Sequence, residues 1–265
     1  MKNGYGSPLL TYSFGGGSRS TSVFARSQGG GEGSFPCVRI LRVHAGPVIL
    51  LASNSPRRRQ LLSLGGWAFN ACSPDVDESL LPGEDPSDYV VRLAETKVRA
   101  AVPQRSGEAY ILGADTAVVD GDTLLGKPVD AQEAVSFLRR LRGHLHQVHT
   151  GIAVLRLADG MLLTDLCVTE VPMRDYSVAE IEAYVQTGDP LDKAGAYAIQ
   201  HPQFQPVASM AGCFASVMGL PMCHVVRLLQ SLGLPPAGDV PAGCQAALTY
   251  QCPVFPAILS GERSG

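Results

Sequence analysis

The sequence lacks the features of several common functional classes. Its seven cysteines are odd in number and form no C-x-x-C pair, which argues against a zinc site and against a complete disulfide framework. The formal net charge of −3 gives no overall positive field for a nucleic acid. No apolar run approaches the roughly 18 residues that a membrane span needs. These absences favour a protein of a reducing compartment, which we expect to be the cytoplasm, with neither nucleic acid nor membrane as a partner.

The residues that are present suit a folded protein with a sizeable core, since 45% are hydrophobic and 17% are charged. Residues 1–46 are rich in glycine and serine and predict a disordered extension. Before Glu32 they contain bases but no acid, so an organelle transit peptide is an alternative interpretation. Residues 47–233 hold the regular hydrophobic patterns and form the expected domain. The Pro- and Gly-rich residues 234–265 predict a poorly ordered tail.

The rest of the chain is organised around residues 48–64. This stretch starts as a short apolar run, typical of a buried strand, and turns near Ser53 into a helix. Ser55 is a suitable N-cap and Pro56 suits the first helical position. Residues 57–59 are arginines, which add charge to a helix end that is already positive. A bound anion such as phosphate would relieve that conflict, although a solvated basic turn is equally compatible with the pattern.

Two charged residues stand out in the next segments. Glu78 belongs to an acidic turn, which either coordinates a hard cation or is simply solvated. Lys97 lies on the apolar stripe of a helix predicted over residues 87–101. Its ammonium group therefore either reaches out to solvent or points into a cleft.

Asp115 lies inside an apolar strand predicted over residues 110–119. A carboxylate in such a place is costly to bury unless it has a partner or a function. The dipeptide Asp120-Gly121 predicts a hairpin turn, after which the return strand leads to Lys127. We therefore expect Asp115 and Lys127 to lie near one another on neighbouring strands.

The second half of the domain predicts a long hairpin between two capped helices. His144 and His146 would share one face of its first strand while His149 points away, so a three-histidine metal site is not expected. Strands and helices alternate with two antiparallel hairpins along the chain. The expected fold class is α/β with a mixed sheet.

Several cations together with two or three carboxylates suit a phosphorylated ligand and a divalent metal. In such a site the positive groups stabilise charge that builds on phosphoryl oxygens, and a carboxylate positions or deprotonates water. A P-loop would need a Gly-x4-Gly-Lys-Ser/Thr motif, and a Nudix enzyme would need a glutamate-rich helix. Neither is present.

Six ordered motifs give the chain a resemblance to the Maf family of nucleoside triphosphate pyrophosphatases from about residue 47 to 233. The motifs are Leu51-Ala-Ser-Asn-Ser-Pro-Arg-Arg58, Gly113-Ala-Asp-Thr116, Gly126-Lys-Pro128, Gly143 to Gly151 with His146 and Thr150, Asp192-Lys-Ala-Gly-Ala-Tyr197, and Met218-Gly-Leu-Pro221. The resemblance implies two lobes around a deep central cleft, as in Maf and ITPase-like folds, and a homodimer.

The resemblance also implies an activity. Family members hydrolyse a nucleoside triphosphate between its α- and β-phosphates, with Mg²⁺ or Mn²⁺ as the divalent metal, and release a monophosphate and pyrophosphate. Asp115 matches the catalytic base, and Glu78 with Asp115 matches the carboxylates at the metal. The residues that match substrate-binding positions are Ser53, Ser55, Arg57, Arg58, Lys97, Thr116, Lys127 and Gln200.

Base preference follows from three of these matches. Arg57, Thr116 and Gln200 together look like the branch of the family that acts on dTTP and UTP. Two departures lie beside Gln200: Ala198 replaces a usual glycine, and residues 201–212 lack the usual Gly-rich turn. The alternative function is a non-catalytic nucleotide-binding regulator of cell division that inhibits septum formation, and measured turnover separates the two.

Overall fold

The computed structural model describes residues 46–262 and 265. The chain divides into two units, Met1–Arg42 and Val43–Gly265, and every described residue belongs to the second. The extension predicted for residues 1–46 thus lies outside the described residues, apart from its last glycine.

A six-stranded mixed sheet forms the centre of the second unit, with strand order β2-β1-β3-β5-β6 and with β4 paired to β3. Strand β1 runs parallel to β2 and β3, whereas the remaining pairs are antiparallel. This confirms the predicted α/β class with a mixed sheet. The strands are β1 (Ile49–Ala52), β2 (Phe69–Cys72), β3 (Tyr110–Asp120), β4 (Thr123–Leu125), β5 (Leu145–Arg156) and β6 (Leu162–Pro172).

The helices begin largely where the sequence places their caps. Ser55 Oγ accepts a hydrogen bond from the amide of Arg58, and Ser177 with Glu180 forms a capping box. None of the described helices is long and apolar enough to cross a membrane. The helices are α1 (Pro56–Ser63), α2 (Pro86–Ala101), α3 (Ala131–Leu141), α4 (Val178–Gln186), α5 (Phe214–Val217), α6 (Met222–Ser231), α7 (Val240–Leu248) and α8 (Phe255–Ser260), with 3₁₀ turns η1 (Val102–Gln104), η2 (Asp189–Asp192) and η3 (Ala194–Ala196).

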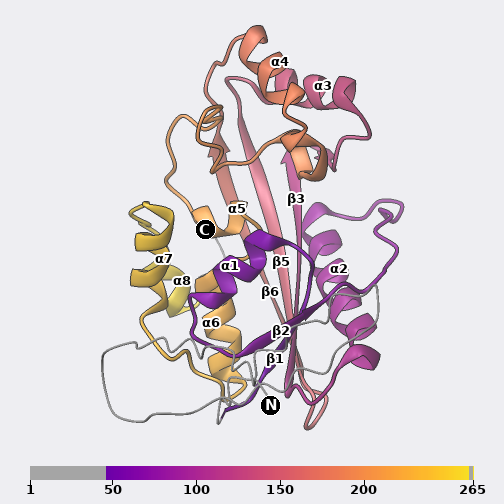
Figure 1. Cartoon of the computed structure of the whole chain (residues 1–265), viewed down its shortest axis with the longest axis vertical. Helices are drawn as coiled ribbons and strands as arrows, with labels where there is room; N and C mark the ends of the chain where they lie inside the picture. Colours follow the sequence, from indigo (N-terminus) through magenta and orange to yellow (C-terminus); the bar gives the residue numbers. More distant parts are fainter. Residues whose placement is uncertain (1–45, 263–264) are drawn as a thin grey trace, which may run out of the picture. The chain divides into compact units, whose positions relative to one another are not determined.

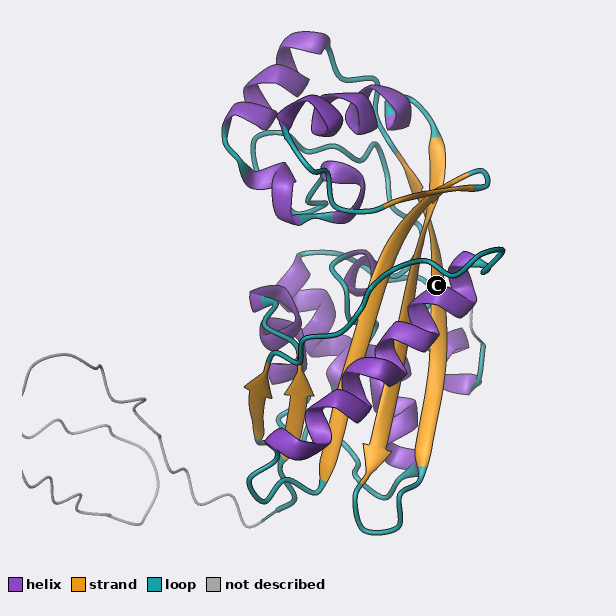
Figure 2. Ribbon diagram, turned by 90° about the vertical axis from the view of Figure 1, so that its right-hand side faces the viewer, coloured by secondary structure: helices purple, strands orange, loops and turns teal. Residues whose placement is uncertain are grey.

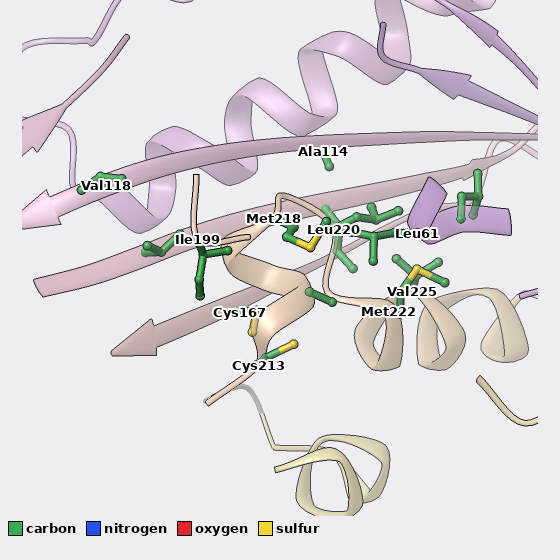
Figure 3. Packing of buried hydrophobic residues seen from close by; sticks show 14 of the residues in the cluster. Leu61, Ala114, Val118, Cys167, Ile199, Cys213, Met218, Leu220, Met222 and Val225 are labelled. Atoms are coloured by element: carbon green, nitrogen blue, oxygen red, sulfur yellow. The ribbon is translucent and has the colours of Figure 1, made fainter. Parts of the chain in front are cut away.

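Apolar side chains cover both faces of the sheet. Helix α2 packs on one face, where Val98 joins a small cluster of strand residues, and Figure 2 shows this helix lying across the strands. The other face carries the main core. Figure 3 shows Leu61 of α1 and Val225 of α6 close to the loop that contains Leu220. The core therefore holds α1 and α6 against the strands that end at the cleft.

Two lobes form because β3, β5 and β6 are longer than β1 and β2. In Figure 1, helices α3 and α4 gather at the end of the sheet where β3 finishes, and β1, β2, α1 and α6 lie at the other end. The cavity described below is lined by α1 on one side and, on the other, by the turns η2 and η3, which contact α4 and α3. The predicted two-lobed architecture is confirmed.

Two glycines let α2 approach the sheet closely. A Cβ on Gly113 of β3 would lie 2.5 Å from the carbonyl oxygen of Ala94, and one on Gly151 of β5 would lie 2.5 Å from the backbone of Val90. Any larger residue would push the helix away. This close approach brings Lys97 on α2 within reach of Asp115 on β3.

The prediction of a poorly ordered tail after Gly233 is wrong for the segment that forms α7 and α8. Asp239 caps α7 by accepting from the amide of Ala242 at 3.0 Å, and Val240 and Ile258 are buried. Both helices contact α6, and Arg227 of α6 donates to the carbonyl of Ile258 at 2.7 Å. Their sequence has little periodicity of its own, so tertiary packing rather than local pattern stabilises them.

Candidate active site

A cavity of about 580 Å³ opens between the two lobes. Its lining contains every residue that the sequence predicts for the site, namely Ser53, Ser55, Arg57, Arg58, Glu78, Lys97, Asp115, Thr116, Lys127 and Gln200. These residues come from seven different segments of the fold, so the sequence alone does not place them together. The volume is in the range usual for pockets that bind small molecules.

At the centre of the cavity one ammonium group joins two carboxylates. Lys97 Nζ lies 2.5 Å from Asp115 Oδ1 and 2.6 Å from Glu78 Oε1. Lys97 therefore points into the cleft rather than outward to solvent. Burial alone would raise the pKa of Glu78, but the hydrogen bond and charge of Lys97, with the charges of Lys127 and Arg58, lower it. Glu78 is consequently ionised at neutral pH.

Arg58 is fixed by the backbone and side chains around it. Its Nε donates to the carbonyl of Gly219 at 2.8 Å, and its Nη2 donates to Thr116 Oγ1 at 3.2 Å. Burial lowers the pKa of this guanidinium, although nearby Asp115 opposes the change. An arginine remains charged in such a place, so it presents a preoriented positive group to the cavity.

The cavity carries an excess of positive charge. Five basic and three acidic side chains line it. Three of the bases, Arg57, Arg58 and Lys127, form no ion pair with any carboxylate among residues 46–262. Lys193 is instead held by Asp189 and Asp192, at 2.9 and 2.6 Å. Three cations thus remain to meet an anionic ligand.

The carboxylates suit a divalent cation. Glu78 and Asp115 converge on one point, where they share Lys97 Nζ. No group of three or more His, Cys, Asp or Glu residues placed to hold a metal occurs within the described ranges. Two carboxylates nevertheless match the way Mg²⁺ is usually bound, through one or two protein carboxylates plus substrate phosphates and water.

Sequence reasoning missed two residues that support the site. Tyr89 lines the cavity and donates its hydroxyl to the carbonyl of Glu78 at 2.8 Å, which holds the acidic loop in place. Burial, with the charges of Asp115 and Glu78, raises the pKa of Tyr89 to about 12, so the hydroxyl stays a donor. Gly219 supplies the carbonyl that orients Arg58. Tyr89 shows as an aromatic residue early in α2, but nothing local indicates its contact with the turn.

The cavity wall near Tyr197 contains a further contact that the sequence did not predict. Tyr197 lines the cavity, and its hydroxyl lies 2.9 Å from Nε2 of His146, which is buried on β5. Burial lowers the pKa of His146 to about 4, so the ring is neutral near pH 7. His146 therefore supports the wall and adds no charge to the cavity.

One expectation about neighbours needs correction. Asp115 and Lys127 both line the cavity, as the hairpin predicted. Lys127, however, follows the end of β4 and does not pair with Asp115, which bonds to Lys97 from the facing helix instead. The hairpin spacing was a weaker guide than the packing of α2 on the sheet.

Comparison with known proteins gives consistent matches. Residues 48–232 match the family model described as Maf-like protein. A dTTP/UTP pyrophosphatase of Anaeromyxobacter dehalogenans is 48% identical over 191 residues, which covers 71% of this chain and 96% of that protein. A dTTP/UTP pyrophosphatase of Geobacter sulfurreducens is 46% identical over 186 residues, which covers 70% and 96%.

A solved structure, the Ham1 protein of Staphylococcus aureus, aligns with 15% identity and a TM-score of 0.35 over 48% of this chain and 72% of that one. A score this low adds nothing to the assignment. The family model covers more than half of the chain, and the two relatives are matched over nearly their whole length. The chain therefore belongs to the Maf family.

Proposed function

We propose that the protein is a nucleoside triphosphate pyrophosphatase that acts on dTTP and UTP. The observation that carries the proposal is one cavity that combines the Lys97-bound Asp115 with the cations Arg57 and Lys127, which form no ion pair with a carboxylate in the described part of the chain. A triphosphate supplies the anionic charge that these cations lack. The printed names of the two relatives support the same activity.

In the proposed reaction, water attacks the α-phosphorus and the bond from that phosphorus to the α,β-bridging oxygen breaks. Asp115 uses the carboxylate oxygen that does not face Lys97 to accept the proton of the attacking water. Lys97 keeps this carboxylate oriented. Arg58 is already held by Gly219, so it meets the growing phosphoryl charge without having to reorganise.

We further propose that Glu78 and Asp115 hold a divalent cation, Mg²⁺ or Mn²⁺, together with the substrate phosphates. When bound, such an ion withdraws charge from the phosphoryl oxygens and helps to orient them. Lys97 stays hydrogen-bonded to Asp115 and keeps that carboxylate oriented.

Base selection is proposed to involve Arg57, Thr116 and Gln200. All three line the cavity, and Thr116 Oγ1 is fixed by Arg58 Nη2 at 3.2 Å and by Thr150 Oγ1 at 3.1 Å. A hydroxyl held in this way offers a defined contact to the nucleotide.

Cytoplasmic location and a homodimer complete the proposal. Six free thiols among the described residues support a reducing compartment, and light scattering on the purified chain tests the dimer.

The deciding experiment is a panel of ordinary and modified nucleoside triphosphates, with pyrophosphate release measured with Mg²⁺, with Mn²⁺ and after chelation. We expect dTTP and UTP to be the best ordinary substrates and chelation to abolish release. A protein that binds dTTP but releases no pyrophosphate with either metal would instead be the nucleotide-binding regulator. Preference for a purine triphosphate would refute the assignment of the base.

A further inference from the structure

A second group of polar side chains is buried between β6, α5 and α6, outside the lining of the cleft. We call it the thiol cluster, and it consists of Cys167, Cys213, Asp165, Ser216, His224 and Arg227. Cys167, Ser216 and His224 are fully buried, and Cys213 is 5% exposed. None of these side chains has a part in the proposed hydrolysis, so the cluster needs its own explanation.

The cluster aligns an acid, an imidazole and a thiol. Asp165 Oδ2 lies 3.1 Å from Nδ1 of His224 and also pairs with Arg227. The other ring nitrogen, His224 Nε2, is buried and has no hydrogen-bond partner among the described residues, and the same is true of Ser216 Oγ. Two donors without an acceptor of normal geometry are unusual in a protein interior.

A thiolate at Cys167 would satisfy these donors. The neighbouring Cys213 thiol, and then the nearby His224 and Ser216, lower the pKa of Cys167 well below its usual range despite burial. Burial acts to lower the pKa of His224, but its hydrogen bond to Asp165 and the nearby Cys167 raise it overall. The two shifts together describe a thiolate and imidazolium pair, the arrangement that makes a cysteine nucleophilic.

Cys213 lies against this thiol. Figure 3 shows the two cysteine side chains next to one another, Cys167 from β6 and Cys213 from the residue before α5. A Cβ placed on Gly265 would overlap Cys167 Sγ and lie only 3.1 Å from Cys213 Cβ. The two cysteines therefore border the same small space.

A small apolar cavity borders the thiol cluster on the side of Cys213. Cys213 lines this cavity, which has a volume of about 20 Å³, whereas Cys167 does not. Cys223, Cys244 and Cys252 line it too, and burial raises the pKa of Cys223 to about 12 and of Cys244 to about 11. Cys223 and Cys244 are therefore protonated near pH 7, whereas Cys167 is the thiol that lies beside His224.

We propose that Cys167 and Cys213 are a reversible redox-modification site that hydrogen peroxide oxidises to an intramolecular disulfide. The Cys167 thiolate attacks one peroxide oxygen and becomes a sulfenic acid, and His224 protonates the hydroxide that leaves as water. The sulfur of Cys213 then attacks the sulfenic sulfur, and the hydroxyl group departs as a second water with the Cys213 proton. Two thiols lose two electrons in total and the peroxide gains them. A dithiol reductant reverses the step by thiol–disulfide exchange.

The site is placed to influence the cleft. Cys213 precedes α5, and the carbonyl of Ser216 within that helix accepts from Thr150 Oγ1 at 3.0 Å. Gly219, which follows the helix, orients Arg58. A covalent bond at the start of α5 therefore restrains the segment that positions Arg58 and Thr116. That consequence for turnover rests on the proposed function, whereas the oxidation itself does not.

The oxidation is tested on the full chain without any nucleotide. The protein is treated with hydrogen peroxide, its remaining thiols are blocked under denaturing conditions, and disulfide-linked peptides are mapped by mass spectrometry. We expect one linkage between the peptides of Cys167 and Cys213 that dithiothreitol reverses. Linkage of any other pair, or persistence of both thiols while Cys72 is oxidised, would overturn the proposal.

Variants separate chemistry from folding. Cys213→Ala should leave Cys167 as a sulfenic acid that a dimedone reagent traps, and Cys72→Ser, on β2, is the matched control that should form the disulfide normally. His224→Asn should slow the oxidation about tenfold, because the thiolate loses its imidazolium partner. An unchanged rate in a folded His224→Asn protein would remove the imidazole from the mechanism.

Turnover gives the second readout. Peroxide treatment should reduce pyrophosphate release about fivefold, the lower end of ordinary coupling between two sites, and dithiothreitol should restore it. Cys213→Ala should resist this loss, since it cannot form the disulfide. A mapped disulfide with full turnover would refute the influence on the cleft and leave the modification site intact.

Discussion

The cleft and the thiol cluster both hold charged groups in the interior, but they face different surroundings. In the cleft, Lys97, Glu78 and Asp115 border a cavity of about 580 Å³, which is also lined by cations that form no ion pair with a described carboxylate. In the thiol cluster, Asp165 and His224 are buried by packed side chains, and neither lines a cavity described above. Charge beside a large cavity is available to a ligand. Charge in a sealed interior can act only on its neighbours, here a thiol.

The largest effect is expected from Asp115→Asn in the cleft. Turnover should fall by about 10² or more, the usual cost of losing a positioned base, while nucleotide binding persists. Pyrophosphate release and isothermal titration calorimetry with dTTP measure the two properties. Asp122→Asn, on the exposed turn between β3 and β4, is the matched control. Near-normal turnover in the Asp115 variant would remove this carboxylate from the mechanism.

Arg227→Met should have the opposite profile, because Arg227 pairs with Asp165 in the sealed cluster. We expect the free energy of unfolding to fall by about 3 kcal/mol, as for one partner lost from a buried pair. Turnover of the folded variant under reducing conditions should be unchanged. Urea denaturation and steady-state assays test this contrast. A large loss of turnover without loss of stability would erase the distinction between the two regions.

Lys97→Met should lower both turnover and the free energy of unfolding, each by less than the variants above. Two carboxylates would face each other without a cation, and the free energy of unfolding at pH 7 should fall by about 1–2 kcal/mol, because Glu78 is half exposed and screened by water. The folded-state pKa of Glu78 lies below the ordinary value of 4.5, so its stabilisation is present above pH 4.5 and disappears as pH falls through the lowered pKa. Denaturation curves at several pH values should therefore show the two proteins converging in acid. A difference in unfolding free energy between the two proteins that stays constant down to pH 2 would contradict this.

The smallest effect is expected from Arg57→Ala. Loss of one charged contact should weaken apparent affinity for dTTP about tenfold, the lower part of the range for hydrogen bonds to charged groups. The preference for dTTP over purine triphosphates should shrink as well. Competition assays across the nucleotide panel measure both quantities, with Arg59→Ala as control because that residue does not line the cavity. Unchanged selectivity would refute a role for Arg57 in choosing the base.

How far the sequence predicted the fold depended on how local each signal was. Ser55 with Pro56, and Ser177 with Glu180, mark helix starts because a cap involves residues only three or four positions apart. The prediction of a poorly ordered segment after Gly233 was wrong for the same reason. Its helices have weak local signals and are stabilised by contact with α6, which no local pattern records.

For the candidate site, the resemblance named ten residues, and the structure brings all ten to one cavity. The roles assigned to them remain predictions. The residues that were missed, such as Tyr89 and Gly219, act through a backbone carbonyl or a hydroxyl contact with a distant segment. Such contacts depend on geometry rather than on residue type, so the sequence has no signal for them.

The sequence by itself determined the helix and strand starts, the α/β class and the family, because these rest on near neighbours and ordered motifs. Only the tertiary structure decided that Lys97 turns into the cleft toward Asp115 and Glu78, and that Cys167 meets His224 and Cys213. In both cases the partners lie on separate elements of the chain, and the packing of a helix against the sheet sets the distance between them. That packing depends on many weak contacts at once, which no short stretch of sequence contains.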